Sequence, residues 1–250
     1  FVRRFESTLA ANGVQILKLW FHLSRDAQQA RIDDLLANPS TAWQVDKLDL
    51  SAHKKFNSIR RASQLILAGT DAPHTPWVVI PSADPKLRMV RTAQAVLASL
   101  KVGAIKVPVF HEPDSVPATP PQVNWLEQLD HNATLSKSDY ETQILLLQNR
   151  LAQLVRHKGF KKRALALVFE GADAAGKGGA IRRVTRAIDA RDFDVMAVAA
   201  PTPSEMSRPY LWRFWCNLPR RGRIAIFDRS WYGRVPVSYT HLTLPTILLV

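Results

Sequence analysis

Residues 165–177 read LALVFEGADAAGK, an apolar run followed by a loop that starts and ends with glycine, and then a lysine. Residues 165–169 have the length and apolarity of a strand buried on both faces, as parallel α/β sheets require. Over residues 171–177 the spacing G-x-x-x-x-G-K is that of a P-loop, whose backbone N–H groups surround a phosphate while its lysine reaches the outer oxygens. The following helix would direct its positive dipole end at the same phosphate. The alternative is a glycine-rich turn that binds nothing, but strand, loop and helix follow in the order that a P-loop requires.

One position of this loop departs from the usual P-loop pattern. Gly178 stands where a Ser or Thr would normally offer a hydroxyl to Mg²⁺, so the metal must be held elsewhere. Asp173, inside the loop, is well placed to hold it. The candidate phosphate-binding glycines are Gly171, Gly176 and Gly178. Lys177 is a candidate catalytic residue, and Asp173 is a candidate for both catalysis and metal binding.

A second motif lies downstream, in residues 222–234, which read GRIAIFDRSWYGR. Its apolar residues 224–227 predict a short strand, and Asp228 follows at the carboxyl end, where open α/β sheets bind their ligands. An aspartate in that position is often only a helix cap or a turn residue. Together with the P-loop about fifty residues upstream, it matches a Walker B aspartate. Asp228 is therefore a second candidate metal ligand and catalytic residue, and the adjacent Arg229 is a further catalytic candidate.

The charge of the chain points to a polyanionic partner. The 250 residues carry a formal net charge of +13, which suits a nucleic acid, an anionic membrane or a polyphosphate. Arginine forks bind phosphate oxygens in pairs, so arginines gathered around the second motif favour a phosphate chain. The alternative is a solvated helix face, in which lysine and glutamate would be mixed. The candidate phosphate-binding arginines of this part of the chain are Arg208, Arg213, Arg220, Arg221 and Arg234.

Three stretches together resemble the type-2 polyphosphate kinases. They are GADAAGKGG from residue 171, PTPSEMSRPYLWRFWCNLPRRG from residue 201, and IAIFDRSWYGR from residue 224. The resemblance is specific, because G-x-D-x-x-G-K-G and FDRSWY are that family's variants of the Walker motifs. It implies a P-loop phosphotransferase that moves phosphoryl groups between inorganic polyphosphate and a nucleotide, with Mg²⁺ as cofactor.

The first part of the chain resembles the closing half of such a domain. Residues 14–23 (VQILKLWFHL) predict a core strand, and residues 24–39 predict a helix capped by Ser24. The resemblance places a helical lid with the pattern S-x-x-x-Q-x-x-R here, on Ser24, Gln28 and Arg31. Arg31 would then close over the phosphates. The alternative is a surface arginine one turn from Asp34.

Strands that alternate with helices predict an α/β fold with a doubly wound parallel sheet. We expect two incomplete tandem units of P-loop type: residues 1–106 close one domain and residues 123–235 open a second, with a proline-rich linker over 107–122. Ser138 and Glu141 are expected to cap the first long helix of the second unit. Residues 236–250 match no family pattern and are expected to have no function.

This organisation resembles the fused two-domain members of the family, which implies phosphorylation of AMP to ADP. The chain starts at Phe1 without a methionine, so we expect a fragment of a longer protein, inactive by itself because neither unit has a whole site. Cys216 is the only cysteine, which favours a cytoplasmic location, and its apolar neighbours predict that it is packed. We expect no membrane or nucleic-acid partner, and a homo-oligomer is left open.

Two other functions remain open from the residues. An ATP-dependent nucleotide kinase would share the loop and the Walker B strand but would not need so extended a group of arginines. A basic nucleic-acid-binding module would need an aromatic platform. The candidates for it, Trp212, Phe214 and Trp215, lie at helical spacings that are typical of a core.

Overall fold

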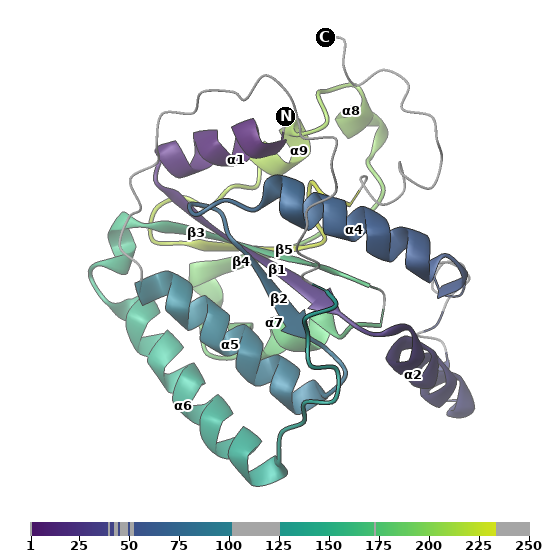
Figure 1. The fold of residues 1–250 in the computed structure, drawn as a ribbon. Helices are drawn as coiled ribbons and strands as arrows, with labels where there is room; N and C mark the ends of the chain where they lie inside the picture. The colour runs from purple at the N-terminus through teal and green to yellow at the C-terminus, as the bar shows by residue number, and fades with distance from the viewer. Residues whose placement is uncertain are drawn as a thin grey trace.

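The computed structural model describes residues 2–39, 41–42, 45, 50, 53–101, 126–172 and 174–233. Its centre is a five-stranded parallel sheet in the order β2-β1-β3-β5-β4 (Figure 1). The strands are β1 (Val14–His22), β2 (Trp77–Pro81), β3 (Ala164–Gly171), β4 (Phe193–Ala197) and β5 (Ile224–Asp228). The α/β class with a parallel sheet is therefore confirmed. The linker over 107–122, the tail over 236–250, Asp173 and Arg234 lie outside the described residues.

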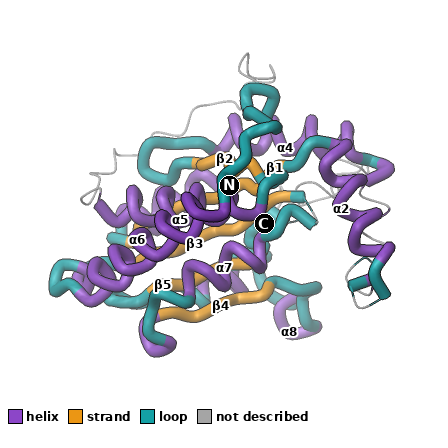
Figure 2. The backbone as a smooth tube through the Cα atoms, turned by 90° about the horizontal axis from the view of Figure 1, so that it is seen from below, coloured by secondary structure: helices purple, strands orange, loops and turns teal. Residues whose placement is uncertain are grey.

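Helices cover both faces of this sheet. On one face lie α1 (Val2–Ala11) and α4 (Phe56–Thr70); on the other lie α5 (Pro85–Lys101), α6 (Lys137–Arg156) and α7 (Lys177–Thr185), which Figure 2 shows across the strands from below. The core splits in the same way, because side chains alternate along a strand: Leu165 and Leu167 belong to one apolar cluster, Ala166 and Val168 to the other. The central strand β3 is buried on both faces, as its apolar run predicts.

Shorter elements complete the fold around the sheet. They are α2 (Arg25–Ala37), α8 (Pro203–Met206) and α9 (Trp212–Trp215), with 3-10 turns η2 (Phe160–Lys162) and η3 (Ala190–Asp192). In both views α2 lies at the periphery, beyond the carboxyl end of β1 (Figures 1 and 2). No helix within the described part of the chain is both long and apolar enough to span a membrane.

The segments on either side of 107–122 share one sheet. Strand β1 pairs with β3 over eight residues, from Val14 opposite Ala164 to Phe21 opposite Gly171. At the last pair the backbones approach so closely that a Cβ on Gly171 would lie 2.2 Å from the carbonyl oxygen of Phe21. Glycine is therefore required there by close packing as well as by its φ of 142°. The division into two units stays a prediction, but the strands of both segments form a single layer.

Two local predictions are wrong. Helix α6 is capped by Ser136, whose Oγ accepts a hydrogen bond from the Asp139 amide at 3.1 Å, and not by Ser138. Ser136 precedes the first helical residue, and Asp139 occupies the third helical position, so the cap begins two residues earlier than the sequence pattern suggested. Cys216 is exposed and not packed, because it follows the short helix α9 at the surface.

Candidate functional site

The P-loop forms a tight turn between β3 and α7. Gly176, at the N-cap of α7, has a φ of 85°, a left-handed conformation that favours glycine. The helix begins at Lys177, whose buried side chain turns back over the loop. Its Nζ donates to the carbonyl oxygens of Gly171 at 2.9 Å and of Ala172 at 3.0 Å. The loop, its lysine and the N-terminus of α7 thus converge on one point, as an anion site requires.

This point opens into a cavity of about 530 Å³. Its walls come from α2, the starts of α5 and α6, the P-loop, α7 and the end of β5, so segments from before and after residues 107–122 both line it. Among the described lining residues the only acidic side chain is Asp228. The basic side chains that line it are Arg31, Lys86, Arg88, Lys177, Arg182, Arg183 and Arg229. The excess of positive charge makes the cavity suitable for a phosphorylated ligand.

The basic lining residues that the sequence reasoning missed are Lys86, Arg88, Arg182 and Arg183, and Arg88 is the most buried of them. It is only 3% exposed, and its Nη1 donates to the Ser82 carbonyl at 2.9 Å. Its Nε is buried without a hydrogen-bond partner among the described residues. A Cβ built on Gly176 would lie 2.2 Å from the Arg88 guanidinium carbon, so the guanidinium lies directly against the phosphate loop.

The electrostatic state of Arg88 fits an anion site. Burial lowers the pKa of its guanidinium to about 10, and the nearby positive charges of Arg31 and Arg183 contribute to the shift. A buried cation surrounded by other cations is unfavourable until an anion neutralises it. The sequence signal was an arginine at a core position of the helix over 86–100, between the apolar residues Leu87 and Met89.

The lid pattern occupies α2. Ser24 caps the helix, since its Oγ accepts a hydrogen bond from the Ala27 amide at 3.2 Å. Gln28 is buried, and its Oε1 lies 3.0 Å from Nδ1 of His53, so it does not line the cavity. Arg31 does line it, and burial lowers the pKa of its guanidinium. The structure therefore brings Arg31 and the P-loop together, although they come from opposite sides of residues 107–122.

The Walker B strand places two predicted residues at the cavity. Asp228 ends β5 and lies opposite Phe169 of β3, so its carboxylate is beside the P-loop. Arg229 follows with a φ of 64°, in the left-handed region, and its amide donates to the Phe169 carbonyl at 3.0 Å. Both residues line the cavity. Glu170, buried before the loop, accepts a hydrogen bond from Ser230 Oγ at 2.7 Å, and burial raises its pKa against the opposing effect of Ser230.

The arginines predicted between the two motifs do not line this cavity. Arg208 lies over the ring of Trp212 at 4.6 Å, and Arg213 pairs with Glu205 at 3.4 Å. Arg220 and Arg221 are exposed in the turn before β5. Of the three aromatic residues expected in the core, Phe214 is buried, whereas Trp212 and Trp215 are 37% and 49% exposed, so the expectation is wrong for both tryptophans. The cavity therefore excludes Arg208, Arg213, Arg220 and Arg221, whereas Arg229, predicted as a catalytic residue, lines it.

The described residues offer few ligands to a metal. No group of three His, Cys, Asp or Glu side chains comes together within the described ranges. Asp228 contributes one carboxylate at the cavity, and Gly178 contributes no hydroxyl. Mg²⁺ is commonly held by one or two carboxylates together with substrate phosphates and water, so this sparse set fits Mg²⁺ in a phosphate site.

Comparisons with known proteins match the chain to a kinase family, which is consistent with a phosphate-binding cavity. The model of the family described as polyphosphate kinase 2 (PPK2) matches residues 1–108 and 134–241. The chain is 40% identical over 242 residues to a polyphosphate:AMP phosphotransferase of Pseudomonas syringae pv. tomato, covering 94% of this chain and 48% of the relative. It is 39% identical over 238 residues to a protein of the same name from Pseudomonas aeruginosa, with the same coverage.

A solved structure titled as a polyphosphate kinase 2 from Pseudomonas aeruginosa is 34% identical, with a TM-score of 0.48, and the match covers 98% of this chain and 46% of that one. The chain thus spans about half the length of the curated relatives it matches.

Proposed function

The chain belongs to the polyphosphate kinase 2 family, and from that premise we propose that its cavity transfers a phosphoryl group between inorganic polyphosphate and a nucleotide, with AMP as acceptor. The observation that carries the proposal is the wall of the cavity, whose described residues include seven basic side chains and one acidic one around a P-loop. The two relatives named polyphosphate:AMP phosphotransferase support the choice of substrates.

In this proposal the side chains act mainly by position and charge, as phosphoryl transfer requires. Lys177, which already lies over the loop, binds the outer oxygens of the transferring phosphoryl group and offsets the charge that grows on them. Arg88 and Arg31 hold neighbouring phosphates from α5 and α2. Arg229 faces the same centre from the end of β5.

Asp228 is the described residue that would hold Mg²⁺, with Asp173 as the second ligand predicted from the sequence. Mg²⁺ would neutralise charge on the phosphate oxygens and align the reacting groups. The backbone of the loop, including Gly171, Gly176 and Gly178, would surround the phosphates through its N–H groups.

We also propose that the 250-residue chain carries this activity by itself. The sequence led us to expect an inactive fragment, because one unit has the lid and the other has the P-loop. That reason no longer applies when Arg31, Arg88 and Lys177 line one cavity. The pairing of β1 with β3 supports the proposal, since it joins the two segments through the centre of the sheet.

The test is ADP formation by the purified chain from AMP, inorganic polyphosphate and Mg²⁺. Lys177→Ala should lower the rate by about a hundredfold or more, as loss of a group that stabilises transition-state charge does. Lys162→Ala, which changes an exposed lysine of η2, is the matched control and should leave the rate unchanged.

Other outcomes of this assay would change the assignment. Formation of ADP with ATP as donor, and none with polyphosphate, would replace the proposal by the ATP-dependent kinase. Native turnover in Lys177→Ala would remove the P-loop from the mechanism.

A further inference from the structure

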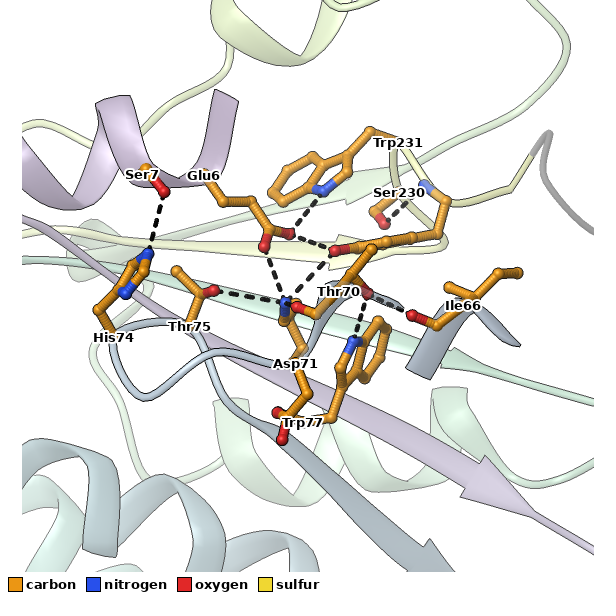
Figure 3. A network of polar contacts seen from close by, with 12 residues as sticks. Glu6, Ser7, Ile66, Thr70, Asp71, His74, Thr75, Trp77, Ser230 and Trp231 are labelled. Carbon is orange, nitrogen blue, oxygen red and sulfur yellow. Dashed lines mark hydrogen bonds and ion pairs between the residues drawn. The ribbon is translucent and has the colours of Figure 1, made fainter. Parts of the chain in front are cut away.

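A buried ion pair joins β1 to α1, on the face of the sheet opposite α7 (Figure 1). Figure 3 shows the network of polar contacts around Glu6. Lys18 of β1 is completely buried, and its Nζ lies 2.7 Å from Oε2 of Glu6 in α1. The same Nζ donates to the Thr70 carbonyl at 2.7 Å. Removing two charges from water costs about as much as their attraction returns, so such a pair is weak evidence for a role in stability alone.

The second oxygen of Glu6 contacts the loop that follows Asp228. Its Oε1 accepts hydrogen bonds from Nε1 of Trp231 at 3.0 Å and from the hydroxyl of Tyr232 at 2.6 Å (Figure 3). Both aromatic residues are buried. Burial and the charge of Glu6 raise the pKa of Tyr232, which keeps its hydroxyl protonated and therefore able to donate. Glu6 thus connects the first helix of the chain to the second motif, more than two hundred residues later.

The same loop holds Arg229 in an unfavourable backbone conformation. A φ of 64° is uncommon for a residue other than glycine, and it persists only where the surroundings enforce it. Two hydrogen bonds hold the two residues that follow Arg229. Ser230 Oγ donates to Glu170 at 2.7 Å, and the Tyr210 hydroxyl donates to the Trp231 carbonyl at 3.0 Å. Glu6 holds the far end of this turn through Trp231.

We propose that Glu6, held by Lys18, is a positioning residue for the reaction: it fixes residues 228–232 so that Asp228 and Arg229 face the phosphate cavity. The role of these two residues at the cavity rests on the proposed function. Glu6 does not line the cavity, and it acts through the acceptor oxygen that it offers to Trp231 and Tyr232.

The decisive experiment compares two double variants that both lack the buried charges and can therefore both fold. Glu6→Gln with Lys18→Met keeps an acceptor oxygen for Trp231, whereas Glu6→Leu with Lys18→Met does not. The first should retain kcat with polyphosphate and AMP. The second should lose about ten- to a hundredfold in kcat at unchanged KM, because displacement of a reacting group by about 1 Å has effects of that size. Equal kcat in both would overturn the proposal.

Two further measurements separate positioning from general loss of structure. In an Arg229→Ala background the Leu variant should cost less than it does in the unmodified chain, because Arg229 is one of the two residues that Glu6 positions and the two effects are then not additive. Additive losses would contradict the proposal. Trp77→Phe is a control within the same network: its indole Nε1 donates to Thr70 and not to Glu6, so kcat should stay within about twofold.

Hydrogen exchange tests the same idea without any activity. The Arg229 amide, bonded to Phe169, should exchange faster in the Leu variant than in the Gln variant. The Leu165 amide, bonded to Arg223 at the opposite end of the sheet, should be equally protected in both. If the unmodified chain makes no ADP, the proposed function fails, while this comparison still decides whether Glu6 fixes the loop. Equal exchange at Arg229 would refute it.

Discussion

Replacing Arg88 by methionine should separate the stability of the chain from its affinity for phosphate. The pKa of the buried guanidinium is lowered from 12.5 to about 10, which corresponds to a charge penalty of roughly 3 kcal/mol in the chain without bound anion. Methionine fills similar space without the charge. It also gives up the hydrogen bond to the Ser82 carbonyl, a loss of about 1–3 kcal/mol. The free energy of unfolding of Arg88→Met should therefore change between nothing and a gain of about 2 kcal/mol.

Bound phosphate should stabilise the unmodified chain more than it stabilises Arg88→Met. With tripolyphosphate at a hundred times its dissociation constant, the unmodified chain should gain about 2.7 kcal/mol of stability. A charge-assisted contact to phosphate accounts for about a hundredfold in affinity, so the gain in Arg88→Met should fall to about 0.4 kcal/mol at the same concentration. The assay is urea unfolding followed by tryptophan fluorescence, with and without tripolyphosphate.

The control for this experiment is Arg163→Met. Arg163 is half-buried and its Nη1 donates to the Leu100 carbonyl at 3.1 Å, but it does not line the cavity. Its variant should keep the full stabilisation by tripolyphosphate. A loss of more than about 2 kcal/mol in Arg88→Met without anion, or an undiminished effect of tripolyphosphate, would refute the reasoning.

Three further outcomes are expected. Asp228→Asn should raise the Mg²⁺ concentration needed for half-maximal ADP formation, because it removes the one described carboxylate of the cavity; an unchanged metal titration would contradict this. Charge reversal at Arg220 and Arg221, which are exposed and outside the cavity, should weaken long polyphosphate chains and leave tripolyphosphate and AMP unaffected, as KM measured across chain lengths will show. His22 has its pKa lowered to about 4 by burial and by His131, so the unfolded chain binds more protons between about pH 6.5 and pH 4. His22 should contribute roughly 3 kcal/mol to the loss of stability as the pH drops through that window, and this contribution should be absent in His22→Gln but present in the exposed His157→Gln.

The sequence predicted the elements whose signals are local. The apolar run of β3, the glycine spacing of the P-loop and the aspartate after β5 each depend on residues close together in the chain, and the structure has all three. The resemblance to a family also selected Arg31, which lines the cavity. Because α/β sheets bind ligands at the carboxyl ends of their strands, these local signals were enough to place Lys177 and Asp228 at the same edge.

The structural features that the sequence did not predict depend on contacts between segments that are distant in the chain. No sequence pattern within residues 1–106 predicts that β1 pairs with β3 or that Arg88 lies against Gly176. The Glu6–Trp231 contact joins residues more than two hundred positions apart, and nothing in the sequence around Glu6 indicates that it contacts the second motif. Conversely, the arginines of residues 208–221 form a strong local pattern, but Arg213 pairs with Glu205, Arg208 lies over Trp212, and Arg220 and Arg221 are exposed. Charge density along the sequence does not specify which charges share a cavity.

In the sheet order β2-β1-β3-β5-β4, strands that are neighbours in space are not always neighbours in the sequence. Strand β1 pairs directly with β3, and Glu6 of α1 contacts Trp231 directly, although long stretches of sequence separate these residues. The segments before and after residues 102–125 therefore meet along the centre of the sheet and again at α1. Two separate polypeptides, one for each segment, should carry complementary surfaces through which they can reassemble.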